Sequence, residues 1–120
     1  MKKEVQLYRK IFLTRSKKAY SKYKEKARLL VENRISYYNK FYRFQINRIA
    51  IKNTRSRWGS CSKAGNLNFN YKIALLPQSL SDYIIVHELC HLGEFNHSKK
   101  FWKLVSVTIP HYKKLRKNFR

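Results

Sequence analysis

The spacing of apolar residues in the first third of the chain predicts one long helix. Across residues 14–39, apolar side chains recur every three or four positions, while lysine and arginine fill the other face. The apolar set is Ala19, Tyr20, Tyr23, Ala27, Leu30, Val31, Ile35 and Tyr38. This period is typical of an amphipathic helix. A basic amphipathic helix can bind a membrane or a nucleic acid, but packing of the tyrosine-rich stripe on a core is the favoured interpretation.

The period of the pattern changes in the middle of the chain, where it predicts strands. Residues 44–51 and 55–61 are predicted strands, separated by the turn-like Lys52-Asn53-Thr54. A second turn signal follows at residues 62–65. Residues 66–73 then alternate strictly between polar and apolar side chains, which is typical of a half-buried strand. Because the three segments are short and closely connected, we expect a small three-stranded antiparallel sheet.

The last third of the chain predicts helices again. Pro77 can occupy the first turn of a helix, and residues 80–92 are apolar nearly all round, which predicts a buried central helix. Gly93 is its expected stop, Asn96 or Ser98 can cap the following helix, and Pro110 ends that helix. We therefore expect an α+β fold in one domain over residues 1–120. Residues 1–43 form its N-terminal helical part, residues 44–75 the small sheet and residues 77–120 the later helices.

Composition narrows the class of protein but does not decide its function. The 120 residues contain 28 Lys and Arg against 6 Asp and Glu, a net charge of +22, which suits either a nucleic-acid partner or a merely soluble surface. Residues 73–98 contain no Lys or Arg but three of the six acids. The longest apolar-rich run, residues 73–81, is too short for a membrane span, and residues 1–12 lack the apolar core of a secretory signal. We expect a cytoplasmic, monomeric domain whose two cysteines stay reduced.

The predicted central helix contains the five residues His87-Glu88-Leu89-Cys90-His91. Imidazoles four positions apart lie about 40° apart around a helix, close enough to hold one metal ion. Glu88 between them can accept a proton from water instead of binding the metal. Cys90 has the size and polarity of a packed core residue. The pentad therefore predicts a metal centre with a general base beside it.

A catalytic zinc ion usually has three protein ligands and an open fourth position. His97 is the favoured third ligand, because a chain that turns at Gly93 can return to the metal within a few residues. Glu94, His111 and Cys61 remain alternatives. Cys61 as a fourth ligand would instead close the site into a structural one.

Several spaced motifs together resemble the YgjP-like metallopeptidase family, which is related to SprT-like zinc metallopeptidase domains. They are Arg55-Ser56-Arg57-Trp58-Gly59-Ser60-Cys61, Gly65-Asn66-Leu67-Asn68-Phe69-Asn70, the pentad at 87–91, Asn96-His97-Ser98 and Phe101-Trp102. The resemblance covers roughly residues 46–110. It implies a minimal zincin-like peptidase fold with one Zn²⁺ on His87, His91 and His97. It also implies that Glu88 is the general base.

The expected function is hydrolysis of peptide bonds in a peptide or protein substrate. Residues 55–61 can offer a strand edge to an extended peptide, and Arg57, Tyr71 and His111 are the candidates for contacting the substrate. One alternative is a zinc-dependent endoribonuclease, a class with the same histidine spacing but typically a glycine at the position of Glu88. Another is a basic nucleic-acid-binding module with a structural zinc, which requires a closed four-ligand site.

Overall fold

The computed structural model describes residues 16–119, and in it the predicted N-terminal helix is confirmed. Helix α2 spans Lys17–Tyr42. Ser16 caps it by accepting a hydrogen bond from the amide of Ala19 at 3.1 Å, and Arg43 ends it in the left-handed conformation, with φ of 57°. The predicted first turn of this helix lies partly within residues 1–15, which are outside the described residues. The expectation that residues 1–12 are not a secretory signal falls in the same segment.

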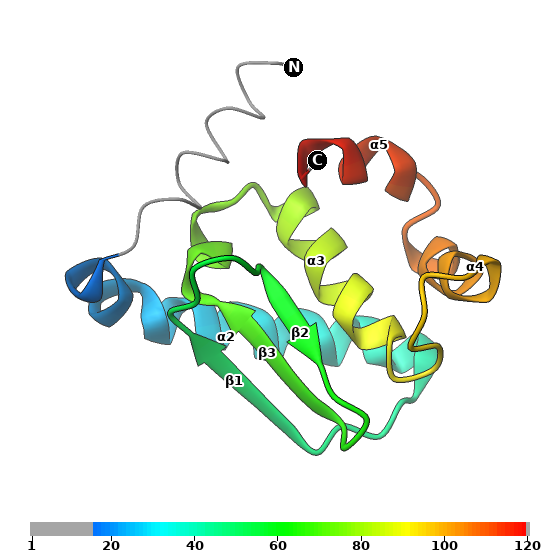
Figure 1. Ribbon diagram of the computed structural model, residues 1–120, viewed down its shortest axis with the longest axis horizontal. Helices are drawn as coiled ribbons and strands as arrows, with labels where there is room; N and C mark the ends of the chain where they lie inside the picture. The colour runs from blue at the N-terminus through cyan, green and yellow to red at the C-terminus, as the bar shows by residue number, and fades with distance from the viewer. Residues whose placement is uncertain (1–15, 120) are drawn as a thin grey trace.

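The sheet has the predicted number of strands, but the expectation that it is antiparallel throughout is wrong. Its strands are β1 (Arg48–Lys52), β2 (Gly59–Cys61) and β3 (Asn66–Asn70), in the order β1-β3-β2. β1 runs parallel to β3, and only β2 is antiparallel to it. Residues 53–58 do not form a hairpin turn, because they take the chain from one edge of the sheet past β3 to the other (Figure 1). β2 is consequently an edge strand.

Asn70, at the end of β3, holds this crossing loop in place. Its buried side-chain amide donates to the carbonyl and the hydroxyl oxygen of Thr54, each at 3.0 Å, and to the carbonyl of Arg57 at 3.3 Å. The Asn70 backbone amide donates to the carbonyl of Trp58 at 2.9 Å. The side-chain oxygen of Asn70 caps a short 3₁₀ helix, η1 (Tyr71–Leu75), where the alternation predicted more strand. The predicted alternation of burial ends here as well, because the polar residues Asn70 and Lys72 are as buried as Tyr71 and Ile73.

Helices make up the last third of the described chain, which with the sheet confirms the predicted α+β class. α3 spans Gln78–Cys90, α4 spans Lys99–Thr108, α5 spans Tyr112–Arg116, and the 3₁₀ turn η2 covers Lys117–Phe119. Ser98 caps α4, while Pro77 lies just before α3 and not within it. In Figure 1, α2 crosses behind the sheet, α3 lies beside β2, and α4 and α5 lie beyond α3. No helix among residues 16–119 is both long enough and apolar enough to cross a membrane.

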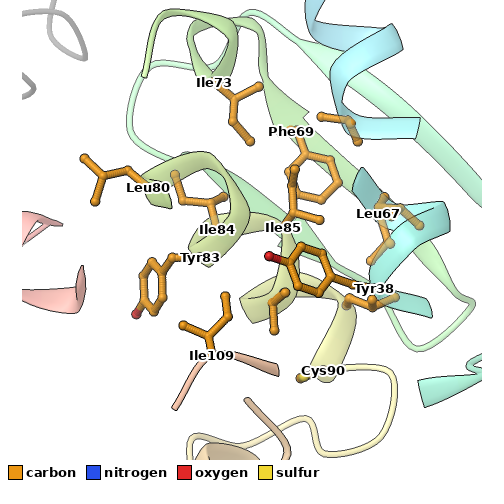
Figure 2. Packing of buried hydrophobic residues seen from close by; sticks show 14 of the residues in the cluster. Tyr38, Leu67, Phe69, Ile73, Leu80, Tyr83, Ile84, Ile85, Cys90 and Ile109 are labelled. Atoms are coloured by element: carbon orange, nitrogen blue, oxygen red, sulfur yellow. The ribbon is translucent and has the colours of Figure 1, made fainter. Parts of the chain in front are cut away.

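α3 is the centre of the hydrophobic core. Its residues Leu80 to Val86 are all buried, as are Leu89 and Cys90. Figure 2 shows Ile85 of α3 among Leu67 and Phe69 of β3 and Tyr38 of α2. Contacts on several sides of one helix leave it little freedom to move. Side chains at its C-terminal end are therefore held on a rigid support.

A charged cluster also joins α2 to α3. Asp82 of α3 accepts hydrogen bonds from Nε and Nη2 of Arg34 at 2.8 and 2.9 Å, and from the hydroxyl of Tyr38 at 3.0 Å. The Asp82 side chain is 11% exposed and that of Arg34 is 22% exposed. The bidentate geometry orients both partners. It fixes how α3 lies against the long helix.

Candidate active site

Three histidine side chains meet at the C-terminal end of α3. His87 and His91 come from α3 and its C-cap, and His97 comes from the loop before α4. The Nε2 atoms of His87 and His97 are 2.8 Å apart, and those of His91 and His97 are 3.1 Å apart. One ligand atom from each ring lies within 4.8 Å of the other two. Among the described residues, no other histidine, cysteine or carboxylate joins this cluster.

The histidine cluster fits a tetrahedral metal ion. Nitrogen ligands about 2.05 Å from a tetrahedral ion lie about 3.3 Å from one another, close to the spacings of the Nε2 atoms here. Nδ1 of His91 lies 3.0 Å from the carbonyl oxygen of Glu94. That contact places the proton on Nδ1 and leaves the Nε2 lone pair directed into the cluster. The donor set is therefore one that a divalent metal such as zinc accepts.

Electrostatics keep the three imidazoles neutral, which is the form that binds metal. Burial, followed by the proximity of the other two histidines, lowers the pKa of His87 to about 3. Burial also lowers the pKa of His91 and of His97. The positive charge of Arg116 contributes to the lowered pKa of His87 and of His97.

Aromatic residues of α4 support the histidines from behind. The buried ring of Phe101 is stacked on His91, with centroids 4.4 Å apart, and lies 5.1 Å from His87 and from His97. Trp102 lies 5.8 and 5.9 Å from His87 and His97. The sequence places Phe101 and Trp102 on the apolar face of an amphipathic helix. That signal predicts burial, whereas contact with all three histidines depends on how α4 packs against α3.

Glu88 is buried against the edge strand of the sheet. A Cβ atom added to Gly59 of β2 would lie 2.9 Å from Cγ of Glu88 and 3.2 Å from its Oε2. The carboxylate is therefore directly beside the backbone of β2. Burial raises the pKa of Glu88 to about 7, although the positive charge of Arg57 opposes part of that shift. A carboxyl group with such a pKa can both accept and donate a proton near neutral pH.

The three candidates for substrate contact lie in different places. Arg57 is exposed and lines a cavity with His87 and Glu88. Tyr71 is 1% exposed and packs edge-on against Tyr20 in the core. His111 is exposed at the N-terminus of α5 and belongs to neither the histidine cluster nor the cavity lining.

The alternative ligands lie outside the histidine cluster of the described residues. Glu94 contacts His91 through its backbone carbonyl only, and Cys61 is half-buried on β2. Burial, followed by the charge of Glu88, raises the pKa of the Cys61 thiol to about 11. Burial also raises the pKa of Cys90 to about 12. Both cysteines are free thiols.

A cavity of about 310 Å³ is lined by His87 and Glu88. It lies between the loop before β2, the side of α3 that includes His87, and the C-terminal turns, and Tyr83, Arg116 and Phe119 are part of its lining. Sequence patterns gave no indication of these three residues. They come from two separate helices and one 3₁₀ turn, and no spacing within one element connects them.

The comparisons with known proteins identify a metallopeptidase family. A family model described as "YgjP-like, metallopeptidase domain" matches residues 4–120, so the chain belongs to the YgjP-like metallopeptidase family, as its motifs predicted. The match extends beyond the 46–110 range of the motifs. Membership implies a metal ion and a peptide or protein substrate. A search of curated proteins found no match.

Solved structures similar to this chain include two archaeal metallopeptidase zymogens. The zymogen of Pyrococcus abyssi abylysin is 24% identical with a TM-score of 0.66, covering 72% of this chain and 89% of its own. The zymogen of Methanocaldococcus jannaschii jannalysin is 25% identical with a TM-score of 0.58, covering 76% of this chain and 90% of its own. A mutant of Wss1 from Saccharomyces cerevisiae is 16% identical with a TM-score of 0.63, covering 87% of this chain and 86% of its own. The likeness to abylysin and Wss1, at these identities, shows a shared fold.

Proposed function

We propose that this chain is a zinc-dependent peptidase in which His87, His91 and His97 hold the metal and Glu88 is the general base. The observation that supports this most directly is the convergence of three neutral imidazoles beside a buried carboxyl group whose pKa is about 7. Three nitrogen ligands with no fourth in the described residues suit a catalytic site, which keeps one position open. A zinc ion, when bound, would acidify a water molecule and polarise the carbonyl group of the peptide bond that is cleaved.

Glu88 performs the proton transfers in this proposal. Its carboxylate accepts a proton from the attacking water and delivers that proton to the leaving amine, a role worth about 10²–10⁴ in rate. Contact with the backbone at Gly59 restricts where the carboxylate can lie. The cysteines do not compete for this role, because the raised pKa of Cys61 and of Cys90 keeps both thiols protonated at neutral pH.

In this proposal an extended peptide binds along β2. β2 is at the edge of the sheet, next to α3, and its first residue is the one that contacts Glu88. A substrate added as a further strand would satisfy the free backbone groups of β2. Its backbone would then pass close to the Glu88 carboxylate, which lies beside Gly59.

Glu88 favours a peptidase over the two other functions. A zinc-dependent endoribonuclease with the same histidine spacing typically has a glycine where Glu88 stands, and a structural zinc needs a fourth ligand. We therefore rank peptide hydrolysis first.

Metal analysis and kinetics of two variants test the proposal. Glu88→Gln should retain one equivalent of zinc and lose about 10²–10⁴ in kcat, because only the proton acceptor is removed. His97→Ala should lose zinc, whereas the matched control His111→Ala should keep both zinc and activity. An unchanged kcat in Glu88→Gln would show that Glu88 is not the general base. Full zinc retention in His97→Ala would show that the third ligand is Glu94, His111 or Cys61 instead of His97.

A further inference from the structure

The cavity beside Glu88 has aromatic walls. Phe119 of η2 is stacked on Tyr83 of α3, with centroids 5.8 Å apart and ring planes inclined by 14°. The same ring meets Trp58 edge-on, also at 5.8 Å. Ile84 completes the apolar part of the lining. Since His87 and Glu88 line the same cavity, a group bound there lies next to the bond that the proposed reaction breaks.

Two arginine residues from separate elements line this cavity. Arg57 lies in the loop before β2, and Arg116 is the last residue of α5. The Arg116 guanidinium lies 4.7 Å from the centroid of the Trp102 ring, a cation–π contact that positions it. Within residues 16–119 neither arginine forms a salt bridge, whereas Arg28 and Arg34 both do. The two charges are therefore available to a ligand.

The cavity is positive although α3, which forms one of its walls, has no Lys or Arg. Residues 73–98 contain no Lys or Arg, so both positive charges come from the flanking segments. Among the lining residues Glu88 is the single acid. Two guanidinium groups against one carboxyl group favour binding of an anion.

We propose that this cavity is a specificity pocket for a carboxylate of the peptide substrate, bound by Arg57 and Arg116. The proposal rests on the proposed peptidase function and adds a substrate class to it. Guanidinium groups bind carboxylates through paired, charge-assisted hydrogen bonds, and the aromatic walls contact the aliphatic part of the same residue. The volume of about 310 Å³ is at the small end of ligand pockets, which suits one residue. The carboxylate belongs either to an acidic side chain or to the C-terminus of the peptide.

Paired peptides test the pocket in the zinc-loaded protein. One pair differs by Glu or Gln at a position next to the cleaved bond, and the other has a free or an amidated C-terminus. In one of the two pairs, we expect kcat/KM of the peptide with the carboxylate to exceed that of its neutral partner about 10- to 100-fold. Hydrogen bonds to charged groups are strong enough to produce a difference of this size. The pair that shows the preference identifies the source of the carboxylate. Equal kcat/KM within both pairs would overturn the proposal.

Variants attribute the preference to the two arginines. Arg57→Gln and Arg116→Gln should each reduce the ratio of acid to neutral kcat/KM, and together they should bring it close to one. Arg116→Lys retains the charge and should keep part of the ratio. Arg55→Gln and Lys117→Gln are matched controls, because both residues are exposed neighbours outside the cavity lining, and they should leave the ratio unchanged. A ratio that persists in Arg57→Gln/Arg116→Gln would overturn the assignment to these arginines.

Binding measurements separate failure of the pocket from failure of the proposed function. Trp58 lines the cavity, so its fluorescence should change when a peptide enters, whether or not the peptide is cleaved. Acid-selective binding that depends on the arginines, without cleavage of any peptide, would remove the peptidase function and leave the pocket in place. Equal binding of acid and neutral peptides would overturn the pocket, whatever the cleavage results.

Discussion

At the scale of single residues, Gly59 is the position where the sheet and Glu88 approach most closely. Its added Cβ would be 2.9 Å from Cγ of Glu88 and 3.1 Å from the carbonyl oxygen of Asn68. Contacts shorter than 3.0 Å are essentially never made by real Cβ atoms, so the Glu88 side chain would have to move. Only glycine allows the carboxylate its present place beside β2.

We predict that Gly59→Ala lowers kcat about 10²-fold while zinc content is retained. A displacement of about 1 Å in a catalytic group can cost that much in rate, and the histidine cluster is not touched by the added methyl group. Extra volume in a packed site should also cost about 1–3 kcal/mol in the free energy of unfolding. Steady-state kinetics, metal analysis and urea unfolding of the variant measure the three quantities.

Gly93→Ala is the matched control for this substitution. Its Cβ would meet the Phe44 ring at 2.8 Å and Leu104 at 3.0 Å, a similar crowding away from Glu88. We expect a comparable loss of stability with little loss of kcat in the folded fraction. An equal fall in kcat for the two variants would contradict a specific role of Gly59 in positioning Glu88.

At the scale of elements, the cluster of Arg34, Tyr38 and Asp82 is the main polar link between α2 and α3 among the described residues. We predict that Asp82→Asn lowers the free energy of unfolding by about 2–3 kcal/mol. The asparagine NH₂ group would face the guanidinium group, and a mostly buried charge would lose its partner. Urea unfolding measures the loss. Glu32→Gln, which breaks the exposed pair of Glu32 with Arg28, is the control and should change stability by about 0.5 kcal/mol or less.

The elements also show which parts of the fold the sequence could predict. Helical periodicity located α2, α3 and α4, and alternation found Leu67 and Phe69 on the buried face of a strand. Alternation reports which face is buried but not which strand is the neighbour or in which direction it runs. The parallel pairing of β1 with β3 depends on the loop that Asn70 holds, and those bonds join residues 13 and 16 positions apart. Contacts over such separations cannot be predicted from the local pattern of polar and apolar residues.

The candidate site divides in the same way. His87, Glu88 and His91 lie within one helical turn and are visible in the sequence, and a short loop after α3 made His97 the favoured third histidine. Arg116 and Phe119 are more than 25 positions from Glu88 and reach the cavity only because α5 packs against α3. The pentad is therefore enough to predict the proposed metal ligands and general base, whereas the residues that would select a substrate required the tertiary structure.

At the scale of the whole molecule, the charge of +22 is distributed unevenly. Residues 73–98, which include α3 and His97, contain no Lys or Arg. The exposed face of α2 and the region of α4 and α5, in contrast, are rich in lysine. The exposed lysines of these two regions are Lys17, Lys18, Lys22, Lys24, Lys26 and Lys40 on α2, and Lys99, Lys100, Lys103, Lys113, Lys114 and Lys117 toward the C-terminus. A basic surface therefore surrounds a site whose own helix is neutral to acidic. Such a surface attracts polyanions without taking part in catalysis.

We predict that this surface binds double-stranded DNA in a salt-dependent manner. Each neutralised phosphate releases counterions, so six to ten contacts would weaken binding about 10³–10⁵-fold between 50 and 200 mM salt. Fluorescence anisotropy over this range measures the slope. Replacing Lys17, Lys18 and Lys22 by Gln, or Lys113, Lys114 and Lys117 by Gln, should reduce the slope by about one for each replaced lysine that binds a phosphate, which identifies the binding face. Glu88→Gln should leave the affinity unchanged, since the carboxyl group is buried away from that surface. Binding that is absent at 50 mM salt, or that does not vary with salt, would mean that the charge has another role, such as solubility.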